Sequence, residues 1–356
     1  MPSMVRKKRR STAKKLLFAL IATVIVLAAI EVGLRVAGFR YVPFLDAASF
    51  WDRFDTEMAG EPPFASDPVL FWRLKPNLYH DVSPETIDYT TTGPHGFRGK
   101  DYPFPLQKPA GMFRVICVGD SSTFGDQVRD GETFAMVLQD RLHKRFPDRA
   151  IDVVNAGVPG YTSHQVRKYI ESELLALSPD VIVVMVGAND LVPAKGNIAD
   201  KDRPQSSVRI AKIRKKIGGL RLYQLLSAVM VPLRHAPKAE ELGKNPDGSD
   251  NIRIRVDYDD FVANLMAIKE MGDRAGYRTI MMTVPHTFEN EHIMNPYTRR
   301  AAKQSGAVLL DLAKRMKVLQ GQGLDLYQPD GGHPSVRGHA EIAAMLEEPI
   351  AKMIGQ

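Results

Sequence analysis

The chain has 356 residues, of which 44% are hydrophobic and 25% are charged, so it is large enough to bury a full α/β core and is not globally disordered. The net charge of +7 arises in residues 1–40, which hold nine Lys or Arg residues and one acid, against thirty-nine bases and forty acids in the rest of the chain. The basic character therefore belongs to a short tail, and the sequence gives no support for a nucleic-acid-binding face.

This basic tail is typical of membrane targeting. Seven bases precede an apolar run from Leu16 to Ile30, and the helical pattern continues to Phe39, which supplies the roughly 20 residues that a membrane span needs. Because basic flanks stay in the cytoplasm, we predict a single-pass signal anchor within 1–40, with the N-terminus cytoplasmic and the remaining chain periplasmic or otherwise extracytoplasmic. A signal peptide cleaved after Ala28 is the alternative.

Residues 41–110 are rich in proline and aromatic residues and show no long periodic segment. We expect this N-terminal extension to pack on the following domain and not to act as a free linker. The chain has a single cysteine, Cys117, so no internal disulfide can form. Since Cys117 lies in a strongly apolar run, we expect a buried core residue and not a catalytic thiol.

From residue 111 to 356, apolar strand patterns alternate with helical patterns. Near-continuous Val and Ile runs between helices are typical of a mostly parallel sheet that is covered on both faces. We predict a flavodoxin-like three-layer α/β/α sandwich around a central five-stranded sheet, with an N-terminal transmembrane helix. The expected strands are Phe113–Val118, Ile151–Val154, Asp180–Val186, Arg278–Val284 and Ala307–Leu310, and the expected helices are Thr133–Phe146, Ser163–Leu177, Tyr258–Ala275, Pro296–Ser305 and Ser335–Ile354.

The alternation is interrupted by an insertion at about residues 193–257. It contains a basic helical stretch, Val208–Leu233, which carries six Lys or Arg residues before Leu222. Three interpretations remain open: a lid over the active site, a surface that faces anionic lipid or glycan, and an amphipathic helix with a solvated basic face.

Four short blocks carry the candidate chemistry. Three follow the first three strands, where ligand sites of parallel sheets lie, and the fourth precedes the last helix. A serine hydroxyl needs a base that takes its proton, and a histidine needs a carboxylate that fixes its tautomer. The blocks are Gly119-Asp120-Ser121, Asn155-Ala156-Gly157-Val158-Pro159-Gly160, Gly187-Ala188-Asn189-Asp190 and Asp330-Gly331-Gly332-His333.

Ester hydrolysis also needs donors for the oxyanion that develops on the former carbonyl oxygen. The backbone N–H groups of Ser121 and Gly160 and the side chain of Asn189 are suitable donors. We expect Asp120 and Asp190 to support the site through hydrogen bonds and not to serve as the triad acid. No cluster has metal-ligand spacing, and the chain has no phosphate-binding glycine loop, so we predict neither a metal nor another cofactor.

The order of these four blocks resembles the SGNH (GDSL-like) serine hydrolase superfamily, in particular its membrane-anchored bacterial envelope members. The resemblance covers about Phe113 to the C-terminus. It implies Ser121 as nucleophile, Gly160 and Asn189 as oxyanion-hole groups, His333 as base and Asp330 as the residue that orients it. Gly160 is preferred to Gly157 because the family pattern Asn-x-x-x-x-Gly matches Asn155 to Gly160. The first block departs from the GDSL consensus, since Ser122 stands in place of leucine.

The sequence therefore predicts a membrane-anchored serine esterase that cleaves acyl or acetyl oxygen esters of a small molecule, lipid or glycan through an acyl-Ser121 intermediate. An O-acetyltransferase that modifies a cell-surface polysaccharide with the same triad is the alternative. A glycan- or lipid-binding module without activity is a further hypothesis, and its signature would be a lost triad residue. None is lost here.

Overall fold

The computed structural model describes most of the chain and divides it into two compact units. The first unit comprises Met1–Phe44 and Ser206–Ala236, and the second comprises Leu45–Gln205 and Pro237–Gln356. The described residues are 12–39, 64–67, 69–81, 89–99, 105–194, 198–203, 217, 219–235, 253–285 and 292–355.

The described residues of the first unit include helices α1 (Thr12–Val36) and α7 (Arg221–His235). Within the described residues, Lys14–Val36 of α1 is the one helical segment that is long and apolar enough to cross a membrane, and its side chains are exposed. Its cleavage and orientation stay predictions. The expected basic helix over Val208–Leu233 is only partly correct, because the chain turns at Gly219 and the described helix begins at Arg221. Residues 204–216 lie outside the described residues.

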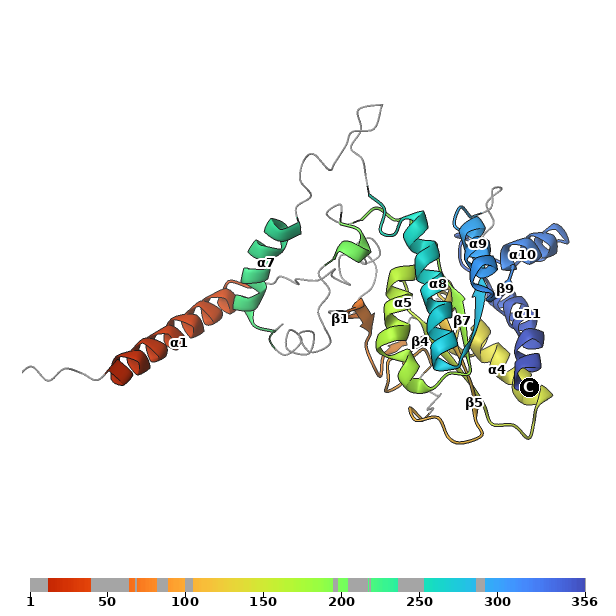
Figure 1. The fold of residues 1–356 in the computed structure, drawn as a ribbon, viewed down its shortest axis with the longest axis horizontal. Coiled ribbons are helices and arrows are strands. Elements are labelled where there is room, and N and C mark those ends of the chain that lie inside the picture. The colour runs from red at the N-terminus through yellow and green to blue at the C-terminus, as the bar shows by residue number, and fades with distance from the viewer. Residues whose placement is uncertain are drawn as a thin grey trace, which may run out of the picture. The chain divides into compact units, whose positions relative to one another are not determined.

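The second unit is built on a five-stranded sheet whose strands all run parallel (Figure 1). The strand order β6-β5-β7-β8-β9 is that of flavodoxin-like folds, so the predicted fold class is confirmed. The chain reverses its direction of winding after β6, which places a crevice at the carboxyl ends of β5 and β7. The strands are β5 (Phe113–Gly119), β6 (Ile151–Gly157), β7 (Val181–Met185), β8 (Arg278–Met282) and β9 (Val308–Leu310).

Helices cover both faces of this sheet (Figure 1). In β5, Ile116 and Val118 belong to the core on one face, and Val115 and Cys117 belong to the core on the other. Cys117 is fully buried, as expected, and burial raises the pKa of its thiol far above the ordinary range. The helices of the first face are α5 (Ser163–Ser172), α8 (Tyr258–Ala275) and α9 (Asn295–Ser305), and those of the second are α4 (Phe134–Arg145), α10 (Leu312–Gly321) and α11 (Val336–Ile354).

The structure differs from the predicted helices in two ways: one predicted helix is shorter, and one helix is additional. The helix expected over Ser163–Leu177 ends at Ser172, and a 3₁₀ turn, Leu174–Leu177, completes the segment. Helix α10 was not predicted at all. Its N-cap is Asp311, whose side chain accepts the N–H of Lys314. In the sequence, an aspartate that caps a helix cannot be told apart from an aspartate in a loop.

Two glycines are required at the site edge because the backbone passes too close for a side chain. A Cβ on Gly119 would lie 2.0 Å from the carbonyl oxygen of Met185 on the neighbouring strand. A Cβ on Gly157 would lie 2.2 Å from the backbone nitrogen of Phe124. A glycine before the expected nucleophile's turn is compatible with a tight turn. The structure adds the stricter reason, which is the close packing of β5 against β7.

The N-terminal extension forms two antiparallel pairs, β1 (Phe64–Asp67) with β2 (Phe71–Leu74) and β3 (Tyr79–Asp81) with β4 (Tyr89–Thr91). Trp72 of β2 is fully buried in the core that includes α5. Its indole nitrogen donates to the carbonyl oxygen of Pro159 over 3.1 Å. The Tyr161 hydroxyl donates to the carbonyl oxygen of Trp72 over 2.6 Å. The extension thus packs against the loop that carries Gly160.

Candidate active site

Ser121 lies where β5 gives way to a single helical turn, α3 (Ser121–Phe124). Asp120 caps this turn, because its carboxylate accepts the N–H of Ser122 over 3.0 Å. The Ser121 side chain is only partly buried, at the carboxyl edge of the sheet. A strand that ends in a capped turn therefore holds this hydroxyl at the carboxyl ends of β5 and β7, the edge at which open α/β sheets bind ligands.

The turn before α11 brings a histidine to this serine. Nε2 of His333 lies 2.8 Å from Oγ of Ser121, and Nδ1 of His333 lies 2.6 Å from Oδ2 of Asp330. With its proton on Nδ1, the imidazole donates to the Asp330 carboxylate and accepts the Ser121 hydroxyl at Nε2. The structure thus brings together the three residues that the sequence nominated as a triad, although more than two hundred positions separate Ser121 from the other two.

Asp330 is held as a carboxylate by several donors. Its Oδ1 accepts the backbone N–H groups of Gly332 and His333 over 2.8 and 2.9 Å, and its Oδ2 accepts the amide of Gln127 over 3.0 Å. Partial burial by itself would raise the pKa of Asp330, but these hydrogen bonds from His333 and Gly332 outweigh it and lower the pKa to about 2. Sequence reasoning missed Gln127, since nothing in its local pattern marks it as a neighbour of Asp330.

Two of the three expected oxyanion donors, Gly160 and Asn189, follow β6 and β7. Gly160 is buried in the left-handed conformation, with φ of 80°, which glycine adopts without strain. The Asn189 amide nitrogen lies 3.3 Å from the carbonyl oxygen of Tyr161 and 3.5 Å from a carboxylate oxygen of Asp120. Asn189 therefore contacts the loop of Gly160 on one side and the residue next to Ser121 on the other.

Asp120 and Asp190 are both buried and both make hydrogen bonds at the edge of the site. Burial raises the pKa of Asp120 to about 6, although the N–H of Ser122 and the charge of His333 oppose the rise. Burial also raises the pKa of Asp190 to about 7 against the hydrogen bonds from Ser163. Neither carboxylate has a hydrogen bond to His333 among the contacts that the structure describes.

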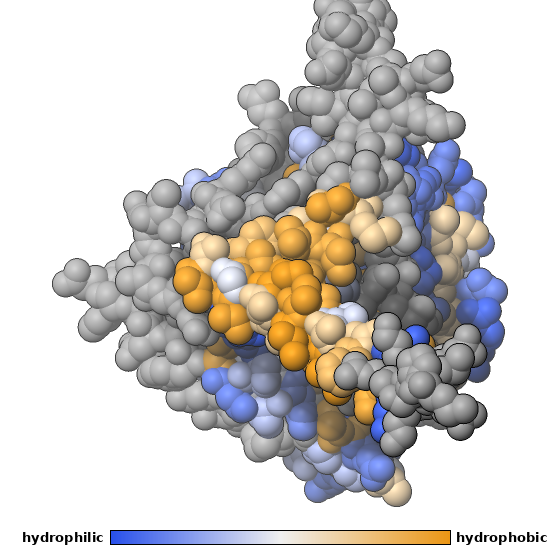
Figure 2. Space-filling view, turned by 90° about the vertical axis from the view of Figure 1, so that its left-hand side faces the viewer, coloured by the Kyte–Doolittle hydropathy of each residue, from blue (hydrophilic) through white to orange (hydrophobic). Residues whose placement is uncertain are grey.

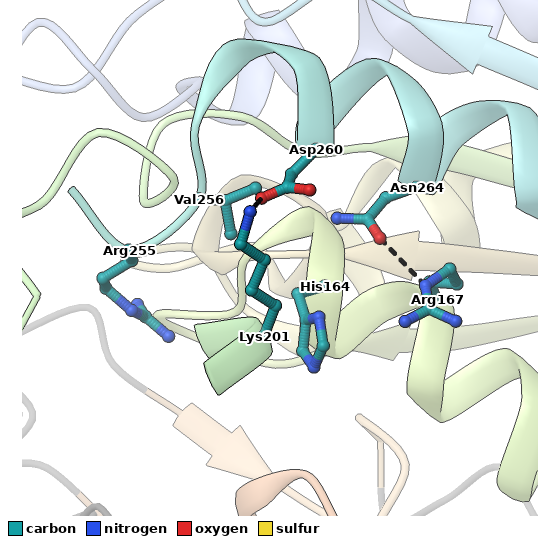
Figure 3. Close-up of a pocket in the computed structure, with 7 residues that line it drawn as sticks. All are labelled: His164, Arg167, Lys201, Arg255, Val256, Asp260 and Asn264. Atoms are coloured by element: carbon teal, nitrogen blue, oxygen red, sulfur yellow. Dashed lines mark hydrogen bonds and ion pairs between the residues drawn. The ribbon is translucent and has the colours of Figure 1, made fainter. Parts of the chain in front are cut away.

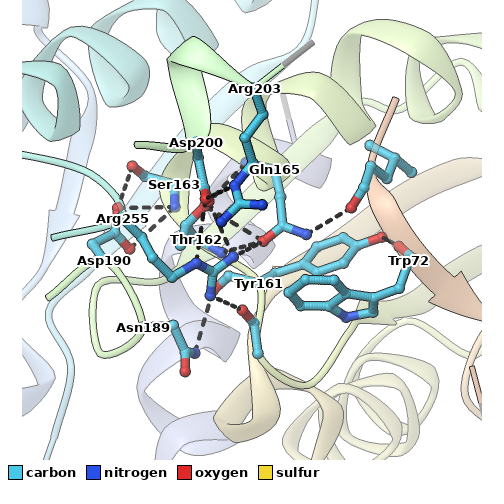
Figure 4. Close-up of polar contacts among 12 residues, drawn as sticks. Trp72, Tyr161, Thr162, Ser163, Gln165, Asn189, Asp190, Asp200, Arg203 and Arg255 are labelled. Carbon is cyan, nitrogen blue, oxygen red and sulfur yellow. Dashed lines mark hydrogen bonds and ion pairs between the residues drawn. The ribbon is translucent and has the colours of Figure 1, made fainter. Parts of the chain in front are cut away.

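A buried polar network contacts the loop that carries Gly160 (Figure 4). Arg255 is 4% exposed and donates to the carbonyl oxygen of Gly160 over 2.8 Å and to the side chain of Gln165 over 2.6 Å. It also pairs with the fully buried Asp200 over 3.0 Å, and Asp200 accepts the hydroxyl of Thr162 over 2.8 Å. The two charged residues come from opposite ends of the insertion, so no local spacing links them in the sequence.

A pocket of about 100 Å³ lies beside this network (Figure 3). Burial lowers the pKa of its His164 to about 4, so this imidazole is neutral at pH 7. The pocket shares Arg255 with the network and contains none of Ser121, Asp330 and His333. Within the described residues, no group of three or more His, Cys, Asp or Glu side chains is arranged to hold a metal ion. The lining residues are His164, Arg167, Lys201, Arg255, Val256, Asp260 and Asn264.

The chain is similar to known proteins through a family model and through solved structures. Residues 117–341, more than half of the chain, match the model of the GDSL-like Lipase/Acylhydrolase family. None of the curated proteins compared with the chain matches it. Similar solved structures include LAE5, an alpha/beta hydrolase enzyme from the metagenome of Lake Arreo, with 17% identity and a TM-score of 0.43 over 68% of this chain and 95% of that one.

Axe2, an acetylxylan esterase from Geobacillus stearothermophilus, is 19% identical, with a TM-score of 0.40 over 68% of this chain and 94% of that one. Structural similarity at this level of identity and TM-score does not indicate the substrate of this chain. The family assignment rests on the family model, because the matched residues run from β5 into α11 and include all four blocks. The chain therefore belongs to the GDSL-like lipase/acylhydrolase family of ester hydrolases.

Proposed function

We propose that the protein is a serine esterase that hydrolyses acyl or acetyl oxygen esters through an acyl-Ser121 intermediate, outside the cytoplasm. The observation that carries the proposal is the contact series from Ser121 Oγ to His333 Nε2 and from His333 Nδ1 to Asp330, at 2.8 and 2.6 Å. Hydrogen-bonded contact between nucleophile, base and orienting carboxylate is the geometry that activates a serine.

In the first half of the reaction, Ser121 Oγ attacks the ester carbonyl carbon while its proton passes to His333 Nε2. The negative charge moves to the former carbonyl oxygen, where the N–H groups of Ser121 and Gly160 and the amide of Asn189 donate to it. Collapse of this intermediate breaks the bond to the alcohol oxygen. His333 gives its proton to that oxygen, and the alcohol leaves.

In the second half, His333 takes a proton from water, and the hydroxide attacks the acyl carbon. Collapse returns the electron pair to Ser121 Oγ, which regains its proton from His333 and releases the carboxylic acid. Asp330 stays ionised throughout, because its pKa of about 2 lies far below neutral pH, and it stabilises the imidazolium that forms in each half.

We further propose that α1 stays attached as the membrane anchor. The support is that the apolar segment Lys14–Val36 has 23 residues, enough to span a bilayer whose hydrocarbon core is about 30 Å thick, and that bases lie at its N-terminal side. Recovery of the full chain from the membrane fraction, with α1 present by mass spectrometry, is the expected result. A mature chain that begins after Ala28 would identify a cleaved signal peptide instead.

The test of the catalytic proposal is labelling of the purified full chain with a fluorophosphonate probe, followed by location of the adduct. We expect the adduct on Ser121 and loss of nitrophenyl acetate hydrolysis in step with labelling. Ser121→Ala should lose both, whereas Ser122→Ala, which removes a neighbouring hydroxyl outside the contact series, should still be labelled.

Turnover that survives in Ser121→Ala would refute the acyl-serine mechanism. A wild-type chain that binds acetylated glycan without labelling or turnover would identify a binding module. Transfer of acetyl from acetyl-Ser121 of the unlabelled enzyme to an added glycan in preference to water would identify the transferase alternative.

A further inference from the structure

Helix α7 of the insertion has an apolar stripe that is half-buried at Leu222 and Leu225 and exposed from Leu226 onwards. Leu222, Leu225, Leu226, Val229 and Met230 follow the spacing that places side chains on one face of a helix. Leu226 and Val229 are each 55% exposed, and Met230 is 45% exposed. Figure 2 shows extensive apolar surface on the side of the molecule that it views. An exposed apolar stripe of this kind marks a surface that contacts a partner.

The start of α7 is fixed to the apolar helix α1 by a carboxylate. Glu31 of α1 accepts the backbone N–H of Leu222 over 2.9 Å at the first turn of α7. Arg35 donates to the same carboxylate over 2.8 Å and to the carbonyl oxygen of Gly219 over 3.2 Å. A carboxylate at a helix N-terminus satisfies an otherwise unpaired N–H and favours the helix dipole. Glu31, the one acid in residues 1–40, therefore has a definite role.

The position of Glu31 along α1 decides where α7 begins. The rise from Lys14 to Glu31 is about 25 Å at 1.5 Å per residue, and the hydrocarbon core of a bilayer is about 30 Å thick. With Lys14 at one face of the membrane, Glu31 and Arg35 lie at the opposite interface. The N-terminus of α7, tied to these two side chains, lies at that interface as well.

We propose that α7 is an interfacial helix whose stripe inserts into the outer leaflet of the membrane that α1 spans. The occupant of the exposed face is lipid, at the boundary between headgroups and acyl chains. We choose lipid as the occupant because α7 is bonded to the apolar helix α1. Glu31 and Arg35 of α1 hold the start of the stripe at the membrane surface. The inference rests on the proposed membrane anchor and extends it to a second contact, made by a segment more than 180 residues away in the chain.

The single, buried Cys117 makes a site-specific test practical, because an added cysteine is the accessible thiol for labelling. The full chain is reconstituted in phosphatidylcholine and phosphatidylglycerol vesicles and labelled with bimane at Val229→Cys, which lies on the stripe. The matched control is Ala228→Cys, one position away and about 100° further round α7, outside the stripe. Ile25→Cys in α1 reports on the anchor, and the exposed Glu270→Cys of the second unit reports on water.

We expect nitroxide on the lipid acyl chains to quench Val229→Cys at least threefold more than Ala228→Cys, and aqueous iodide to show the reverse order. Iodide quenching of Val229→Cys at the level of Glu270→Cys, while Ile25→Cys responds to lipid, would overturn the inference and leave the anchor intact. If Ile25→Cys also responds only to iodide, the anchor itself fails. Protection of Val229→Cys from both quenchers would indicate a second protein copy and would also overturn the inference.

Discussion

Arg255 offers the sharpest test of how the insertion is coupled to the candidate oxyanion hole. Its guanidinium joins the carbonyl oxygen of Gly160, the side chain of Gln165 and the carboxylate of Asp200, and it lies 5.3 Å from the centre of the Trp72 ring. Gly160 is one of the expected donors to the oxyanion. Removal of this side chain should therefore change both stability and catalysis.

The stability cost follows from what Arg255→Met leaves behind. Asp200 is fully buried and would lose its closest cationic partner, keeping the hydroxyl of Thr162 and the more distant Arg203 at 3.4 Å. Breaking a buried ion pair from one side costs about 3–5 kcal/mol, and the remaining partners favour the lower end. About 3 kcal/mol corresponds to a fall of about 6–12 °C in the melting temperature of a unit of this size.

Arg255→Met should also lower kcat, because the loop that carries Gly160 loses its hydrogen bond to Arg255. Loss of one oxyanion donor lowers kcat by about 10²–10³-fold. Arg255 holds the Gly160 peptide and does not donate to the oxyanion, so we expect a smaller fall, of about 10–100-fold, with KM nearly unchanged. Arg255→Lys keeps the charge with fewer contacts and should restore part of the rate.

The assay combines thermal melting with nitrophenyl acetate kinetics measured well below the melting temperature. Arg167→Met is the matched control, since Arg167 lines the same pocket and bonds to Asn264 but has no described contact with the Gly160 loop (Figure 3). A folded Arg255→Met protein with wild-type kcat would refute the reasoning, as would an equal fall in kcat for Arg167→Met.

Two further predictions concern the carboxylate of the proposed triad and a buried histidine. Asp330→Asn should lower kcat by about 10²–10⁴-fold at every pH from 5 to 9, because an amide no longer stabilises the imidazolium and the pKa of about 2 keeps the wild-type carboxylate ionised over that range. A fall confined to one end of the pH profile would contradict this role. His339 is fully buried, its Nδ1 accepts the N–H of Phe134, and burial lowers its pKa from 6.5 to about 3. Its stabilising contribution is thus present above pH 6.5 and declines as the pH falls towards 3, so the melting temperature of the wild type should fall more steeply between pH 7 and 4 than that of His339→Asn. Parallel slopes for the two proteins would show that His339 does not titrate as described.

The sequence by itself determined the fold class and the identity of the residues at the carboxyl edge of the sheet. Apolar runs of strand length between helical segments favour one architecture, and the edge residues directly follow those strands, so local pattern placed Ser121, Gly160 and Asn189 together. The turn Asp330 to His333 was predictable for the same reason, since it immediately precedes the last helix. Some predicted boundaries were wrong: α5 ends at Ser172 and not at Leu177. The hydrophobic pattern does not show the hydrogen bonds that end a helix, so it does not fix the last turn.

Only the tertiary structure decided which distant side chains touch these residues. Three hydrogen bonds join segments whose spacing in the chain gives no hint of the contact. They are the bonds from Gln127 to Asp330, from Arg255 to Gly160 and from the N–H of Leu222 to Glu31. Such contacts depend on where loops and an insertion return to the core, and loop paths follow from packing and burial of charge, not from periodicity. The sequence thus nominated the residues that we propose do the chemistry, and the fold decided which neighbours hold them in position.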